Sequence, residues 1–229
     1  MAITLYELAG AEEARRFSPH CWKARMALAH KGLDAERVAW RFTEKETIAF
    51  SAQGRVPVLR DGDRGVADSW QIACYLEATY PDRPSLFRGD EGVSRFVNNW
   101  ADSVLLPALA RLIVTDVFDH LHEKDKAYFR ETREARFGMK LEAVTADREQ
   151  SVAVFRQALQ PLRATLADQP FLGGDQPVYA DYCVFGLFMW ARCSSAFPIL
   201  EADDPVTAWR GRLLDAFDGL ARKAPGYDC

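Results

Sequence analysis

The sequence of 229 residues changes its pattern once, at about residue 80, and this change constrains the fold more than any other feature. Before it, short apolar stretches alternate with Gly, Pro and Asp, which is typical of mixed strands and helices. From Glu91 onward the strand pattern disappears and apolar residues recur at helical spacing. The intervening PDRPSLFRGD has the composition of a linker. We therefore expect an α/β domain over residues 1–82, a linker over 83–90 and an all-helical domain over 91–229.

The first part predicts the element order β-α-β-α-β-β-α. The expected strands lie in ITLYEL, in AERVAW, and in two segments of VPVLRDGDRGVAD that a turn at Asp61-Gly62-Asp63 would join. The expected helices cover Pro19–Lys31, TEKETIAF and Ser69–Tyr80, and the first of them should end at Gly32.

The second part predicts long helices. Phe96, Trp100, Val104 and Ala108 follow one another at helical spacing, and Pro107 within this helix should kink it. The segment Ala180–Ala191 is almost wholly apolar, so we expect it to be a helix buried on all sides.

Composition excludes several classes of protein. The net charge is −4 with interspersed signs, which offers no basic field for nucleic acid or an anionic membrane. The apolar runs are too short to span a bilayer, and the first residues do not resemble a secretory signal. The five scattered cysteines form no C-x-x-C pair and the four histidines no metal pattern, so we expect no disulfide framework, no metal site and a cytoplasmic location.

The stretch RFSPHCWK at Arg16–Lys23 holds the main candidate for chemistry. Ser18 precedes Pro19, and both are favoured at a helix start, so Ser18 can be a helix cap and nothing more. The same geometry also suits catalysis, because a helix N-terminus stabilises an anion and a hydroxyl that donates to a sulfur favours its thiolate. Cys21 is the rival nucleophile, although the first position of a redox C-x-x-C turn is occupied here by Ser18. One turn into a helix, a cysteine more often behaves as a small buried apolar residue.

Several local motifs, taken with this organisation, resemble the cytosolic glutathione transferase superfamily. They are SPHCWK, HKG, RVPVL, DSW, YLEATYPDRPSLF, GGDQPVYADY and DDPVTAWR, and the resemblance runs from Ile3 to about Tyr227. It is strongest to the branch that contains bacterial lignin β-etherases and related fungal serine-type transferases. The resemblance implies a thioredoxin-like N-terminal domain, a C-terminal helical-bundle domain, glutathione as co-substrate and a homodimer.

The resemblance also assigns site residues. Ser18 would activate the glutathione thiol, and the backbone of Val56, before a cis Pro57, would pair with the tripeptide as an added strand. Asp68 and Ser69 would hold the γ-glutamyl end, although either can instead be a plain helix cap. Arg55 would pair with the glycyl carboxylate, although a solvated surface arginine is also compatible with the sequence.

A second substrate would lie between the domains, above the sulfur. The candidate lining residues are Phe17, Trp22, Trp100, Leu106, Leu109, Ile113, Phe118 and Phe185, although aromatic residues at helical spacing are more often core. His20 can face this pocket or the surface. Asp181 is expected to cap the apolar helix from a buried position, in a capping box left incomplete by Val178.

These observations predict a glutathione transferase in which the thiolate attacks a hydrophobic, aromatic electrophile. Cleavage of β-aryl ethers is the narrower expectation, because the same branch includes detoxifying transferases. Two alternatives stay open: a glutathione-dependent thiol-disulfide reductase that uses Cys21, and a non-catalytic binder of hydrophobic ligands.

Overall fold

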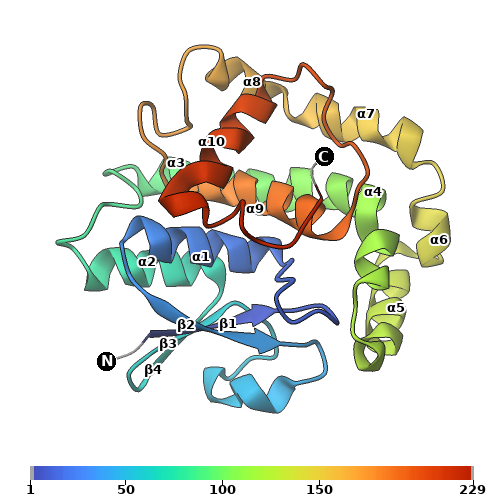
Figure 1. Cartoon of the computed structure of the whole chain (residues 1–229), viewed down its shortest axis with the longest axis horizontal. Coiled ribbons are helices and arrows are strands. Elements are labelled where there is room, and N and C mark those ends of the chain that lie inside the picture. The colour runs from blue at the N-terminus through green and yellow to red at the C-terminus, as the bar shows by residue number, and fades with distance from the viewer. Residues whose placement is uncertain (1–2, 228–229) are drawn as a thin grey trace.

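Strands and helices alternate in the first part of the chain, and helices make up the second (Figure 1). The computed structural model describes residues 3–227. The elements of the first part are β1 (Ile3–Leu8), α1 (Pro19–His30), β2 (Ala35–Trp40), the 3₁₀ helix η1 (Lys45–Ser51), β3 (Val58–Asp61), β4 (Arg64–Ala67) and α2 (Ser69–Thr79). The predicted order is confirmed, and the short second helix is of the 3₁₀ type.

The four strands form one mixed sheet in the order β2-β1-β3-β4. β1 runs parallel to β2, from the pair Ile3 and Ala35 to the pair Leu8 and Trp40. β3 is antiparallel to both β1 and β4. In Figure 1, α1 and α2 lie between this sheet and the helices of the second part. This is a thioredoxin-like domain, as expected, and one face of its helices is available for packing against the second part.

The second part is helical, as expected. Its elements are α3 (Glu91–Trp100), the π-helix η2 (Ala101–Leu105), α4 (Leu106–Asp119), α5 (Glu123–Phe137), α6 (Leu141–Val144), α7 (Arg148–Ala158), α8 (Gln160–Leu166), α9 (Tyr179–Ser194) and α10 (Val206–Gly219). Within residues 3–227, no helix combines the length and the apolar character needed to cross a membrane.

Helix α9 is the centre of the core. All its residues except Trp190 are buried, which confirms the expectation for the apolar segment. Its most extensive helix contact is with α1. Gly186 makes this contact possible, because a Cβ at this position would lie 2.5 Å from the carbonyl oxygen of Pro19. The close approach fixes the start of α1 against the helical domain.

The N-terminus of α9 is held by Asp181. The capping box is incomplete, as expected, because the Val178 side chain has no acceptor. Asp181 nevertheless accepts hydrogen bonds from the amides of Val178, Leu172 and Gly173 and from the Trp209 indole, at 2.8–3.3 Å. The incomplete box does not weaken the cap, because donors from the preceding loop and from α10 replace its missing half.

The helix that contains Pro107 does not simply bend. The five residues Ala101–Leu105, which precede Leu106 and Pro107, form a π-helical turn. The Leu106 amide donates to the carbonyl of Ala101 across this turn. Proline lacks an amide hydrogen and its ring collides with the preceding turn of an α-helix, and the wider π turn accommodates both effects. The π turn also carries Asp102, which faces α1 at the candidate site.

The apolar periodicity of this region predicted the helix but not its buried face. Phe96 is 72% exposed and Val104 44% exposed. The core side is formed instead by small and polar positions, among them Ser94 and Asn98, together with Leu105. The second part therefore presents an apolar strip on its outer surface.

Candidate functional site

Ser18 lies at the N-cap of α1. Its Oγ accepts a hydrogen bond from the Cys21 amide at 3.4 Å, and its carbonyl accepts one from the Trp22 amide at 3.1 Å. A hydroxyl has one donor and two acceptor sites, so capping leaves the Ser18 hydrogen free to donate elsewhere. Among the described residues, this hydrogen interacts only with the Cys21 thiol, and sulfur is a weak acceptor. Ser18 is thus a cap and, at the same time, a donor available to a ligand.

Ser18 opens onto a cavity of about 360 Å³ between the two domains. The cavity lies beside the N-terminus of α1, whose positive partial charge favours an anion there. Pro19 has no N–H and the amides of Cys21 and Trp22 are donated to Ser18, so His20 supplies the amide of this turn that is left for a ligand. Seven aromatic side chains line it: Phe17, Trp40, Phe42, Tyr128, Phe129, Phe137 and Trp190. A ligand with an anionic atom near Ser18 and an apolar, aromatic body fits this combination.

Only two of the eight side chains expected in this pocket line it, namely Phe17 and Leu106. The other six candidates do not line it, in line with the expectation that most of the set would be core: Trp22, Trp100, Leu109, Ile113, Phe118 and Phe185. Most of these six are core residues. Trp22, for example, is 1% exposed and donates its indole hydrogen to the carbonyl of Arg16. Helical spacing marks a packed face, but it does not say whether the face meets another helix or a cavity.

Half of the aromatic lining residues that sequence reasoning missed come from α5. Tyr128, Phe129 and Phe137 are isolated apolar residues in an otherwise highly charged helix, and this contrast was the available signal. Asp125 holds α5 in place. Its buried carboxylate accepts hydrogen bonds from the amides of Phe42 and Thr43, both at 3.0 Å, and from the Thr43 hydroxyl at 2.8 Å. The loop after β2 and α5 therefore form one rigid wall.

Three arginines lie at the cavity: Arg55, Arg133 and Arg136. The guanidinium of Arg133 stacks over the rings of Phe42 and Phe129, at 5.0 and 4.5 Å from their centroids. Burial, and then the charge of Arg136, lower the pKa of Arg133 to about 10, so it stays cationic at neutral pH. Sequence reasoning identified Arg55 but missed the two arginines on α5. Together they offer a carboxylate or another anion a second point of attachment.

The other expected glutathione-binding residues divide into two groups. Val56 lines the cavity beside Arg55, and the Val56–Pro57 peptide bond is cis. Among the described residues, no backbone hydrogen bond uses the amide or the carbonyl of Val56, so both are available to a ligand. Asp68 and Ser69 do not line the cavity. Asp68 is the N-cap of α2, where its Oδ1 accepts from the next helical amides at 2.9 and 3.2 Å.

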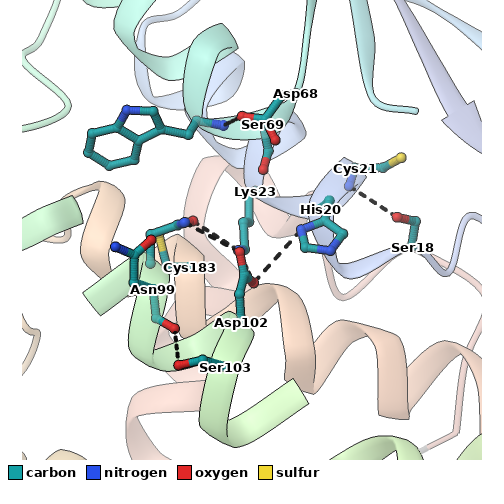
Figure 2. A network of polar contacts seen from close by, with 12 residues as sticks. Ser18, His20, Cys21, Lys23, Asp68, Ser69, Asn99, Asp102, Ser103 and Cys183 are labelled. Carbon is teal, nitrogen blue, oxygen red and sulfur yellow. Dashed lines mark hydrogen bonds and ion pairs between the residues drawn. The ribbon is translucent and has the colours of Figure 1, made fainter. Parts of the chain in front are cut away.

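A polar network joins the start of α1 to the π turn (Figure 2). Lys23 is fully buried, and its ammonium donates to Asp102 at 2.7 Å and to Asn98 at 3.0 Å. His20 also lines the cavity, and its Nδ1 lies 3.9 Å from the Asp102 carboxylate. Burial and then the Lys23 ammonium lower the pKa of His20, while Asp102 and Asp68 oppose this. His20 is therefore neutral at physiological pH.

The Cys21 side chain does not line the cavity at Ser18. Its side chain is fully buried. Burial, followed by the nearby Glu7 carboxylate, raises the pKa of its thiol to about 12. Since the thiolate is the nucleophilic form, Cys21 is not activated in this structure.

Two protein-family models match this chain. The model described as "Glutathione S-transferase, C-terminal domain" matches residues 92–217, more than half of the chain. The chain belongs to the glutathione S-transferase family. The model of the N-terminal domain of glutathione S-transferases matches residues 17–79, which begin next to Ser18 and end with α2.

Among curated glutathione S-transferases, the similarity is distant. The chain is 28% identical to the glutathione S-transferase-like protein ustS of Aspergillus flavus over 55% of this chain and 50% of that protein. It is 23% identical to glutathione S-transferase U22 of Arabidopsis thaliana over 77% of this chain and 71% of that protein. The chain thus spans about half the length of the first of these relatives.

Solved glutathione S-transferases share the whole fold. The transferase GSTFuA3 of Phanerochaete chrysosporium superposes with a TM-score of 0.83 at 26% identity, over 93% of this chain and 96% of that one. A glutathione S-transferase of Ceriporiopsis subvermispora, solved in complex with glutathione, gives 0.84 at 24% identity, over 95% and 97% of the two chains. The β-etherase LigF of Sphingobium sp. strain SYK-6 gives 0.67 at 18% identity, over 94% and 96%. At such identities, the last two share the fold alone.

Proposed function

We propose that this protein is a glutathione transferase that activates glutathione as a thiolate for attack on a hydrophobic, aromatic electrophile. The observation that carries the proposal is Ser18: its hydroxyl lies at the N-terminus of α1 and opens onto an aromatic cavity, and its hydrogen has only the weakly accepting Cys21 thiol as a partner among the described residues. The thiol proton leaves to solvent, and the sulfur forms the new C–S bond. The electrophile then either accepts the electron pair by addition or releases a leaving group with it.

Glutathione would lie along the inner edge of the cavity. The free amide and carbonyl of Val56 would pair with its cysteinyl backbone, and Arg55 would pair with its glycyl carboxylate. Asp68 and Ser69 would hold the γ-glutamyl end. Because capping uses only Oδ1 of Asp68, its Oδ2 is left to meet the ammonium group.

We propose β-aryl ethers as the narrower substrate class. The cavity wall has seven aromatic side chains, enough to hold both rings of such a substrate by stacking. The bond formed would be C–S, and the bond broken would be the ether C–O, with a phenolate as leaving group. Attack by an ordinary transferase on other aryl electrophiles, in detoxification, uses the same groups.

The deciding experiment measures glutathione-dependent product formation with a model β-aryl ether and with an activated aryl halide. Products from both support the full proposal, and a product from the halide alone restricts it to a general transferase. Binding of glutathione without any turnover would favour the non-catalytic binder. Deglutathionylation that depends on Cys21 would favour the reductase, which the buried, protonated thiol argues against.

We also propose a homodimer in the cytoplasm. The dimer is supported by the exposed apolar residues Val93 and Phe96 on α3 and by Val104 after them. The reducing compartment is supported by four cysteines that stay unpaired: Cys21, Cys74, Cys183 and Cys193. Sedimentation of the wild type and of Phe96→Asp tests the dimer, because a charge in a buried apolar interface should give monomers.

A further inference from the structure

The lining of the cavity at Ser18 contains positive charges and no negative ones. Three guanidinium groups line it, on Arg55, Arg133 and Arg136, and no aspartate or glutamate among residues 3–227 does. The proposed transferase chemistry uses only one of the three, since Arg55 would pair with the glycyl carboxylate of glutathione. Arg133 and Arg136, both on α5, are left for the second substrate.

Two carboxylates lie just outside this lining, and both are already engaged. Asp125 accepts hydrogen bonds from the amides of Phe42 and Thr43, both at 3.0 Å. Asp102 accepts a hydrogen bond from the buried Lys23 ammonium at 2.7 Å. Each carboxylate is therefore committed to the scaffold and does not occupy the guanidinium groups of the cavity.

The electrostatic surroundings of Arg133 agree with this. Burial is the largest influence on its pKa and lowers it, and the charges that follow are those of Arg136, Tyr128 and Arg55. No carboxylate is among them, so no acidic side chain of the described residues offsets the positive charge of Arg133. An anionic group brought in by a ligand would do so.

Arg133 differs in this from the arginine three residues earlier on α5. The guanidinium of Arg130 donates to Glu134 at 3.0 Å and to Glu142 at 3.2 Å, and it does not line the cavity. Arg133 donates from Nη1 to the Thr132 hydroxyl at 2.8 Å, whereas its Nε and Nη2 donate to no described residue. Two donors of Arg133 are thus left for a ligand.

These two donors are accessible and held in one orientation. The Arg133 side chain is only half-buried, and within residues 3–227 the side-chain atoms that are both enclosed and without a partner belong to Arg16 and Ser194. The guanidinium is stacked over Phe42 and Phe129, which fixes its plane. Its donors then lie at the edge of that plane, where a carboxylate can accept two parallel hydrogen bonds.

We propose that the aromatic electrophile of this enzyme carries a carboxylate, which Arg133 binds in the cavity and Arg136 attracts from its exposed position on α5. The inference rests on the proposed function and names the substrate class of the same cavity. The glutathione thiolate forms the C–S bond at a ring carbon or at the ether carbon, and a halide or phenolate leaves with the electron pair. The carboxylate takes no part in this step and stays bound to Arg133.

The test compares two aryl halides that differ in one charge. One is a chloronitrobenzoate with its carboxylate para to the chlorine, and the other is the uncharged methyl ester of the same acid. Steady-state kinetics at a fixed glutathione concentration give kcat/KM for each, and the ratio of acid to ester is the acid preference. The intrinsic reactivity of each halide is the same for every variant, so it cancels when acid preferences are compared.

Arg133→Gln should lower the acid preference by about tenfold, the effect of losing one charge-assisted hydrogen bond. Arg133→Lys keeps the charge without the planar fork and should retain part of the preference. Arg130→Gln is the matched control, because it removes a guanidinium from the same helix that is paired with two carboxylates outside the cavity, and it should leave the preference unchanged. If Arg133→Gln does not fold, Arg136→Gln at its exposed position carries the test, with an expected decrease of about threefold.

Binding of the product separates this inference from the proposed function, because it needs no turnover. The full chain is titrated calorimetrically with the glutathione conjugate of the nitrobenzoate and with the methyl ester of that conjugate. Tighter binding of the acid conjugate that Arg133→Gln abolishes would confirm the carboxylate site, and it would do so even if no electrophile were turned over and the transferase proposal failed. Equal acid preferences of the wild type, Arg133→Gln and Arg136→Gln would overturn the inference. So would a KM for glutathione that rises in Arg133→Gln by the same factor with acid and with ester, since Arg133 would then hold the glycyl carboxylate.

Discussion

Replacing Ser18 by alanine separates its two roles. The capping hydrogen bond to the Cys21 amide is long, at 3.4 Å, so its loss should lower the free energy of unfolding by only about 0.5–1 kcal/mol. Within the described residues the hydroxyl hydrogen meets only the weakly accepting Cys21 thiol, and a hydrogen bond donated to a thiolate is worth about 1.5–3 kcal/mol. Each 1.4 kcal/mol corresponds to about one pKa unit, so Ser18→Ala should raise the pKa of bound glutathione by about one to two units.

The assay is the pH dependence of turnover, together with the ultraviolet absorbance of the bound thiolate. Below the pKa of the bound thiol, the thiolate fraction falls about tenfold per pH unit. The acidic limb of the profile should therefore move up in pH by the same one to two units. Turnover by Ser18→Ala is then reduced at least about tenfold at low pH and approaches the wild-type rate well above both pKa values.

Ser18→Thr is the matched control, because threonine keeps both a hydroxyl and a capping side chain. Its profile should stay close to that of the wild type, and glutathione affinity should change little in both variants. A Ser18→Ala enzyme that loses activity equally at every pH, with an unshifted thiolate titration, would refute the reasoning. Ser18 would then position the substrate without ionising it.

Three further predictions test the scaffold and the cysteines. Gly186→Ala should lower the free energy of urea unfolding by about 2 kcal/mol or more, because its Cβ would lie 2.5 Å from the backbone of α1. The control is Gly211→Ala on α10, whose Cβ would meet nothing within 4 Å and which should not destabilise the protein. Asp125→Asn should lower the free energy of unfolding by about 1–3 kcal/mol, because three donors lose a charged acceptor that fixes the cavity wall. Steady-state kinetics should show a raised KM for the aromatic substrate. An alkylating reagent should modify the partly exposed Cys74 before the buried Cys21, as followed by mass spectrometry, and rapid labelling of Cys21 would contradict this. Cys21→Ala should retain transferase activity, because burial raises the pKa of the Cys21 thiol to about 12.

Features that depend on neighbours in sequence were predictable. A serine before proline indicates a helix start, so the cap at Ser18 was predictable from local chemistry and is confirmed. The place of Val56 beside a cis proline was expected from the family resemblance, and the structure has that cis bond. Arg55 follows from its place beside Val56. Asp68 was correctly recognised as a potential cap, but the sequence could not tell that capping would leave it outside the cavity.

Features that depend on packing were not predictable. The aromatic wall draws on β2, α5 and α9, which the sequence separates by more than a hundred residues between Trp40 and Trp190. Phe96 and Val104 follow the helical period as core residues do, yet they lie on the outer surface. Two donors of the buried Arg16 side chain, Nε and Nη1, have no hydrogen-bond partner within residues 3–227, and the sequence gives no sign of this because an arginine before an apolar residue is ordinary.

The sequence by itself determined the mixed α/β half, the helical half, the capped start of α1 and the serine that opens it, because propensity, periodicity and capping act over a few residues. The tertiary structure alone decided which side chains surround that serine and which charges remain without a partner. The reason is physical: the burial of a side chain and the pKa of a group depend on what other segments bring against them. Gly186 shows the boundary between the two, because it is an ordinary glycine in the sequence and yet lets α1 approach α9, which sets where Ser18 lies.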